Sequence, residues 1–279
     1  MNDSLHSNAP TIGVFDSGFG GLTVLRALIE KLPRANFAFV GDTARLPYGS
    51  KSRRTIARYA AQSARFLVEE QNAEFIVIAC NTASALALDA IQDAVSVPVL
   101  GVIEPGATAA RQASKTGDVL VIATDATVLS QAYTAACRAQ GLRALEKACP
   151  LLVPLVEEGW TDHPVTVEVI DIYLNELRAE AWAHGLNPDT LVLGCTHYPL
   201  LRPLIQRAVR PGVKVIDSAE ATAQIAAQMF NGRATGEISA AEPTEIRCFA
   251  TDSVEKFERL GSRFLGRPVG KVELLDLGG

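Results

Sequence analysis

The sequence predicts an α/β protein made of two similar domains, whose mainly parallel sheets face each other across a central active-site cleft. Short apolar runs alternate with longer stretches in which apolar residues recur every three or four positions, the pattern of strands followed by helices. Several runs are apolar throughout, as expected for parallel strands covered on both faces. One plan of strands and polar turns also occurs twice, which divides the chain into two α/β halves.

The predicted strands follow one another along the whole chain, with helical patterns between them. Apolar residues at helical spacing predict helices at 23–31, 53–71, 219–230 and 253–265. The expected strands are residues 11–15, 37–40, 75–79, 97–102, 119–123, 190–194, 213–216 and 246–250.

The repeated plan consists of a polar turn after one strand and a cysteine after a later strand. Asp16 and then Cys80 follow this plan in the first half, and Thr124 and then Cys195 follow it in the second. We therefore expect the first domain to span residues 1–103 and the second to span 104–217. A returning segment, 218–279, is expected to complete the first domain.

Composition excludes several classes of protein. The 279 residues are 48% hydrophobic and 20% charged, close to the average of soluble globular proteins. A net charge of −5 argues against nucleic acid or an anionic membrane as the main partner, because phosphate contacts need clustered cations. The basic cluster at 51–54 begins a helical pattern and is interpreted as a solvated face.

The cellular compartment is expected to be the cytoplasm. No apolar run reaches the length of a membrane helix, and residues 1–10 lack the basic and apolar parts of a signal peptide. The five cysteines should then be reduced, and the absence of a C-x-x-C pair argues against a disulfide framework or a zinc ribbon.

Polar residues gather where the predicted strands end, which is where open α/β sheets bind ligands. Helix N-termini that follow such strands offer free N–H groups to carboxylates or phosphates. We expect a small anion, held by hydroxyls and backbone N–H groups rather than by arginines. The candidate binding residues are Asp16, Ser17, Pro47, Tyr48, Gly49, Ser50, Asn81, Thr82, Thr124, Thr196 and His197, with Asp42 in the same loop region.

Cys80 and Cys195 are the leading candidates for chemistry. A single cysteine at a strand end is usually a small core residue, but two at equivalent positions favour a function. Two thiols suit attack on one carbon from opposite faces: a thiolate removes a proton, and the opposite thiol delivers one. His197 titrates in the useful range beside Cys195. Asp16 suits either a helix cap or a catalytic role.

Cofactor chemistry finds no support in the sequence. The "GFGG" segment at 18–21 lacks the spacing of a dinucleotide-binding loop, and no phosphate-binding P-loop occurs. No lysine lies at a strand end where pyridoxal phosphate could be attached, and the four histidines are too scattered for a metal site. We expect neither a cofactor nor a metal.

Six segments in order, "GVFDSGFGGLTVL", "GDTARLPYGSKS", "ACNTASALAL", "GVIEPGA", "LVLGCTHYPLL" and "DSAEATA", closely resemble the glutamate racemases. These are cofactor-independent enzymes that make D-glutamate for peptidoglycan. The resemblance implies that Cys80 acts on D-glutamate and Cys195 on L-glutamate, assisted by Asp16, His197 and Glu158. It also implies a homodimer, with activation by a cell-wall precursor in some members.

Two other classes of function remain open at the level of the sequence. One is a related enzyme, such as an aspartate racemase or a decarboxylase, although a decarboxylase would need only one thiol. The other is a two-domain binding protein without activity, which would need a shaped cleft but no paired thiols.

Overall fold

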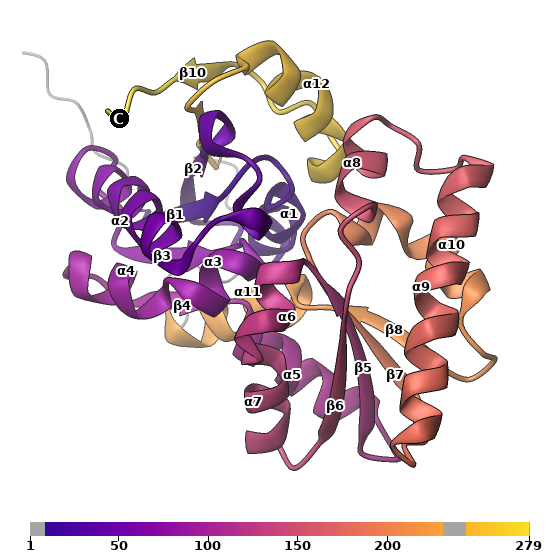
Figure 1. Cartoon of the computed structure of the whole chain (residues 1–279). Coiled ribbons are helices and arrows are strands. Elements are labelled where there is room, and N and C mark those ends of the chain that lie inside the picture. The colour runs from indigo at the N-terminus through magenta and orange to yellow at the C-terminus, as the bar shows by residue number, and fades with distance from the viewer. Residues whose placement is uncertain (1–8, 231–243, 279) are drawn as a thin grey trace, which may run out of the picture.

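The computed structural model describes residues 9–230 and 244–278, so most of the 1–10 segment considered above lies outside these ranges. Figure 1 shows two groups of helices and strands, the first carrying β1 to β4 and the second carrying β5 to β8. The C-terminal β9, β10 and α12 lie with the first group. The prediction of two parallel α/β domains is confirmed.

The first sheet is wholly parallel in the described ranges, with strand order β10-β9-β2-β1-β3-β4. Successive side chains of β1 point to opposite faces, so Ile12 and Val14 pack against α1 while Phe15 packs against α2. Both faces are therefore covered, which explains the unbroken apolar runs. Its strands are β1 Thr11–Asp16, β2 Asn36–Gly41, β3 Phe75–Ile78, β4 Val99–Gly101, β9 Ile246–Ala250 and β10 Val272–Leu274.

The second sheet is also parallel and has the order β6-β5-β7-β8. When the first four strands of each half are numbered in chain order, both sheets contain them in the order second, first, third, fourth; β9 and β10 extend the first sheet beyond β2. The repeated plan in the sequence therefore corresponds to a repeated topology. Its strands are β5 Asp118–Ala123, β6 Arg143–Ala148, β7 Thr190–Gly194 and β8 Lys214–Asp217.

All the predicted strands are present, with ends within two residues of the expected ones. β6 and β10 were not predicted. Both are edge strands, and the sequence of β6, "RALEKA", mixes charged and apolar residues because only part of it is covered. The limits of the domains stay a prediction.

The helices cover the sheets and join the two domains. α5 follows β4 of the first sheet and packs against the second sheet, whereas α11 returns to pack against α1. The helices are α1 Leu22–Lys31, α2 Arg53–Glu69, α3 Asn81–Leu86, α4 Leu88–Ala94, α5 Ile103–Ala113, α6 Asp125–Ser130, α7 Ala132–Ala139, α8 Leu152–Glu157, α9 Pro164–Ala183, α10 Arg202–Ala208, α11 Ala219–Met229 and α12 Val254–Leu265, with 3-10 turns η1 Thr43–Arg45, η2 Tyr48–Ser50 and η3 Tyr198–Leu201.

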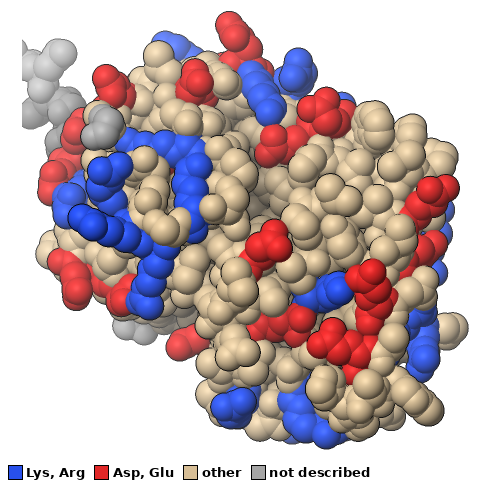
Figure 2. Space-filling view, viewed as in Figure 1, with Lys and Arg blue, Asp and Glu red and all other residues tan. Residues whose placement is uncertain are grey.

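Basic side chains gather on the first domain in Figure 2, in the region of α2. Arg53, Arg54 and Arg58 of α2 are exposed, and Arg53 pairs with Asp89 at 2.6 Å in an ion pair open to water. Exposed pairs of this kind contribute little to stability. The interpretation of the 51–54 cluster as a solvated face fits this exposure.

Candidate active site

Cys80 and Cys195 occupy the same place in the two sheets. Each follows the third strand of its half, Cys80 after β3 and Cys195 after β7. β3 pairs with β1, which ends at Asp16, and β7 pairs with β5, which ends just before Thr124. Only 5% of Cys80 and 7% of Cys195 is exposed. The carboxyl ends of parallel strands thus bring one buried sulfur to the binding edge of each sheet.

Cys80 lies in surroundings that favour the neutral thiol. Its Sγ donates to Ser17 Oγ at 3.4 Å and accepts from the backbone N–H of Ala83, also at 3.4 Å, as the cap of α3. Burial raises the pKa of the Cys80 thiol to about 12, and the negative charge of Asp16 adds to the rise. The resting form of Cys80 is therefore the protonated one.

Cys195 lies beside an imidazole that carries a positive charge. Its Sγ is 3.9 Å from His197 Nδ1. Burial alone would lower the pKa of His197, but its contacts with the sulfur of Cys195 and the carboxylate of Glu157 outweigh this effect and raise the pKa to about 10. An imidazolium next to a sulfur atom stabilises negative charge there. The two cysteines therefore have opposite electrostatic surroundings.

Asp16 connects the surroundings of the two cysteines. Its side chain is buried at the end of β1, and Oδ2 accepts a 2.9 Å hydrogen bond from the N–H of Gly18. Oδ1 has no hydrogen-bond partner among the described residues. Burial raises the pKa of Asp16, while the charge of His197 opposes the rise. One oxygen of a buried carboxyl group is thus left to accept a hydrogen bond from a ligand.

Glu157, and not Glu158, contacts His197. Its Oε1 lies 3.4 Å from His197 Nε2, and its Oε2 accepts a 3.0 Å hydrogen bond from Lys256 of α12. Burial would raise the pKa of Glu157, but the ion pair with His197 and the contact with Lys256 lower it. Glu157 is the last residue of helix α8, and the exposed Glu158 that follows it lines a neighbouring pocket.

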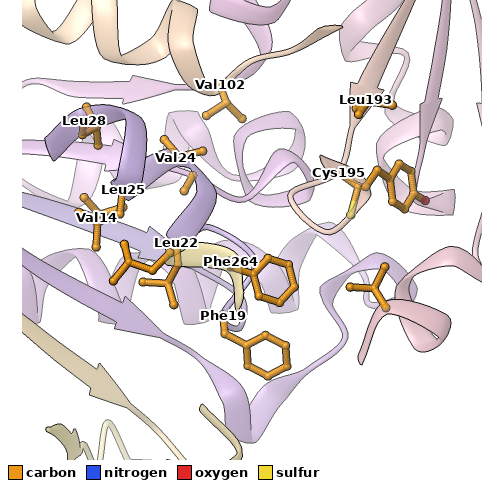
Figure 3. Packing of buried hydrophobic residues seen from close by; sticks show 14 of the residues in the cluster. Val14, Phe19, Leu22, Val24, Leu25, Leu28, Val102, Leu193, Cys195 and Phe264 are labelled. Carbon is orange, nitrogen blue, oxygen red and sulfur yellow. The ribbon is translucent and has the colours of Figure 1, made fainter. Parts of the chain in front are cut away.

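Aromatic rings from the first domain enclose His197. The ring of Phe19 lies 5.9 Å from the imidazole, and the ring of Phe264 lies 5.2 Å from it, edge to face. Figure 3 shows Phe19 and Phe264 side by side, with Cys195 at the end of the strand that carries Leu193. These rings exclude water from the imidazole, which strengthens its interaction with Glu157.

A pocket of about 350 Å³ opens between η2 and the second domain. Pro47, Gly49 and Ser50 line one side, and Thr124 and Glu158 lie on the other. This volume accommodates a small organic anion.

Tyr48 of the same turn does not line this pocket. Its hydroxyl donates to the carboxylate of Asp42, and its side chain is buried within the first domain. We therefore place Tyr48 as a support of the η2 turn.

The two domains meet at the remaining predicted residues. The hydroxyls of Thr82 and Thr124 are 2.9 Å apart, and Thr82 also lies 3.2 Å from the hydroxyl of Thr127. At Gly20 a Cβ would lie 2.4 Å from Thr196 Oγ1 and 2.8 Å from His197 Nδ1, so only glycine allows this approach.

Asn81 completes the junction. It lines a void of about 10 Å³ together with Cys195 and Thr196, which places it beside the cysteine of the other domain. The predicted residues from both halves therefore converge at one junction.

Some residues of this junction were not singled out by the sequence. Thr127 lies one helical turn after Thr124, and the position of Glu157 on α8 decides which member of the acidic pair faces inward. Tyr133, which bonds Asn81, lies in a helix with no chemical motif. Glu157 could have been singled out from the sequence if residues 152–157 had been predicted to form a helix.

Residues 9–230 and 244–278 contain neither a metal-site cluster nor a membrane-spanning helix. No group of three or more His, Cys, Asp and Glu residues there is arranged to hold a metal ion. No helix in the same ranges is both long and apolar enough to span a bilayer.

The raised pKa of His197 predicts that stability falls with rising pH. The stabilisation is complete below about pH 6.5, the ordinary pKa of histidine, and is lost as the pH rises through about 10. Between about pH 7 and 8 we expect the free energy of unfolding in urea to decrease by about 1 kcal/mol per pH unit from this group. His197→Gln should flatten the profile, and equal slopes in both proteins would contradict the prediction.

Comparison with known proteins gives consistent results. The profile of the family described as Asp/Glu/Hydantoin racemase matches residues 12–226. Glutamate racemase of Koribacter versatilis (strain Ellin345) is 54% identical over 97% of this chain and 98% of its own length.

Two solved structures match nearly the whole chain. Glutamate racemase from Francisella tularensis subsp. tularensis SCHU S4, in complex with D-glutamate, is 35% identical with a TM-score of 0.84 and covers 98% of this chain and 99% of its own. Escherichia coli glutamate racemase, in complex with L-glutamate and the activator UDP-MurNAc-Ala, is 26% identical with a TM-score of 0.75 and covers 97% and 100%. The chain therefore belongs to the Asp/Glu/Hydantoin racemase family and, within it, to the glutamate racemases.

Proposed function

We propose that this protein interconverts L-glutamate and D-glutamate by moving the Cα proton between Cys80 and Cys195, without a cofactor. The observation that carries the proposal is the matched placement of the two cysteines, one after the third strand of each sheet, in opposite electrostatic surroundings. A binding module would need no such pair. The full-length similarity to glutamate racemases supports glutamate as the substrate.

In each turnover one sulfur accepts a proton from the substrate and the other sulfur donates a proton to it. Starting from L-glutamate, the Cys195 thiolate forms an S–H bond with the Cα proton, and the C–H electron pair stays on the substrate as a carbanion. That carbanion then takes the proton of the Cys80 thiol on its opposite face, which leaves a Cys80 thiolate. The reverse reaction exchanges the roles, and proton exchange through the solvent restores the starting state.

The surroundings of the sulfurs match these two roles. His197 stabilises the negative charge at Cys195, and Glu157 holds the imidazolium in place. Ser17 and the N–H of Ala83 are placed to hold the sulfur of Cys80. The free Oδ1 of Asp16 suits the ammonium group of the substrate. Hydroxyls and N–H groups at the strand ends would bind its carboxylates.

We extend the proposal to the biological setting. D-glutamate produced in the cytoplasm would supply peptidoglycan synthesis, as the resemblance to glutamate racemases implies. We also propose a homodimer. A cell-wall precursor is a candidate activator, since the Escherichia coli relative was solved with UDP-MurNAc-Ala.

The proposal predicts racemisation with solvent exchange. Purified protein, dialysed against a chelator, should bring L-glutamate to zero optical activity with no added cofactor, as followed by circular dichroism. In deuterium oxide each molecule of D-glutamate formed in a single turnover should carry deuterium at Cα, because the proton delivered comes from the opposite thiol. Protium retained at Cα would rule out two bases.

The same assay separates the alternatives. Aspartate should turn over much more slowly than glutamate, and faster turnover of aspartate would identify an aspartate racemase. Calorimetric binding of glutamate without any α-proton exchange would identify a binding protein.

A further inference from the structure

Tyr133 of α7 lies between the two cysteine loops, although it belongs to no motif and touches neither sulfur in a hydrogen bond. Its side chain is fully buried in the second domain. Its hydroxyl donates a 2.6 Å hydrogen bond to Oδ1 of Asn81, the residue that follows Cys80 in the first domain. One side chain thus connects the domain that carries Cys195 to the loop that carries Cys80.

Two glycines make room for the Tyr133 ring. At Gly194, the residue before Cys195, a Cβ would lie 3.0 Å from Cε2 of the ring. At Gly106 of α5, a Cβ would lie 3.1 Å from Cε1 and from the hydroxyl oxygen. The ring therefore packs directly on the backbone that leads to Cys195, and it is held on both sides.

The hydrogen bond also determines how Asn81 presents its amide. Burial raises the pKa of Tyr133, so the hydroxyl keeps its proton and acts as a donor at neutral pH. A donor at Oδ1 fixes the amide so that its two N–H donors point to the other side. Asn81 lines a void of about 10 Å³ together with Cys195 and Thr196, so its side chain lies beside the cysteine of the second domain.

We propose that Tyr133 is a positioning residue that sets the spacing of the two cysteine loops and orients Asn81, whose N–H donors then bind a carboxylate of the substrate. This inference rests on the proposed racemisation of glutamate. Tyr133 does not touch the reacting atoms, so its effect must pass through Asn81 and the Cys195 loop.

Tyr133→Phe tests the proposal because it removes only the hydroxyl and keeps the ring. We expect the KM for glutamate to rise in both directions and kcat/KM to fall by about 3- to 10-fold, the effect of losing a hydrogen bond between two neutral groups. A Tyr133→Phe variant within about twofold of the unaltered protein would overturn the proposal.

Tyr198→Phe is the matched control for stability. Tyr198 is also fully buried, but its hydroxyl donates to the carbonyls of Ala123 and Cys149 within the second domain. Both variants should lower the melting temperature, while only Tyr133→Phe should change KM. An equal loss of kcat/KM in the two variants would indicate a general packing effect and overturn the proposal.

A double-mutant cycle with Asn81→Ala tests whether Tyr133 acts through Asn81. Once the amide is absent, adding Tyr133→Phe should change kcat/KM by less than about twofold. A full additional loss in that background would overturn the proposal. If the unaltered protein does not turn over glutamate, the proposed function fails and this inference with it. If it turns over glutamate while the cycle is additive, only this inference fails.

Discussion

Cys80→Ala and Cys195→Ala are each expected to abolish the interconversion of L- and D-glutamate in both directions. Each variant removes one of the two groups that transfer the proton, and the remaining sulfur serves only one face of the substrate. General acid–base groups contribute about 100- to 10,000-fold to rate, so we expect a loss of at least this size. Circular dichroism at saturating L-glutamate or D-glutamate measures the effect.

Isotope exchange should separate the two variants. Following the roles implied by the resemblance, Cys195→Ala should still exchange the α-proton of D-glutamate with deuterium oxide, and Cys80→Ala should exchange only that of L-glutamate. Cys248→Ala is a matched control, because Cys248 is a buried strand cysteine in the core of the first domain. It should keep its activity. Substantial racemisation by both Cys80→Ala and Cys195→Ala would disprove the two-thiol mechanism.

Glu157→Gln is expected to lower kcat/KM by about 10- to 100-fold. The variant keeps the shape of the side chain but removes the charge that faces His197 Nε2 at 3.4 Å. We take about 1.5–3 kcal/mol for the loss of this partly buried ion pair, which corresponds to the expected change in rate. Without the carboxylate the pKa of His197 should fall, so the alkaline limb of the pH–rate profile should move to lower pH.

Glu158→Gln is the matched comparison. The resemblance to the family assigns the assisting role to Glu158, whereas the contacts favour Glu157. Glu158 lines the pocket but does not contact His197, so Glu158→Gln should lower kcat/KM by less than Glu157→Gln does and should leave the alkaline limb of the pH–rate profile in place. A larger loss from Glu158→Gln than from Glu157→Gln would show that the contact between Glu157 and His197 is not the functional one.

The architecture was predictable because most strands are covered on both faces and are therefore apolar throughout. The same rule explains why β6 and β10 were not predicted. Both are edge strands, and their exposed residues interrupt the apolar pattern by which the other strands were identified. The C-terminal β9 was found because four of its five residues, all except Arg247, are apolar.

The candidate site was predictable to the extent that its residues directly follow strands. Asp16, Cys80 and Cys195 are positioned by the sheet edge, which periodicity locates. Glu157 and Tyr133 lie on helices, and their direction depends on how α8 and α7 pack in three dimensions. No local pattern contains that information, because a helix can present either of two adjacent residues to a neighbour.

The shared strand order of the two sheets bears on the energetics of the proposed reaction. Enantiomers have equal free energies in an achiral solvent, so the Haldane relationship requires equal kcat/KM in the forward and reverse directions. Two halves with the same topology can each place a cysteine on one side of the substrate Cα. The two sulfurs have different neighbours, an imidazolium beside Cys195 and a serine hydroxyl beside Cys80. The value of kcat can therefore differ between the two directions while kcat/KM stays equal.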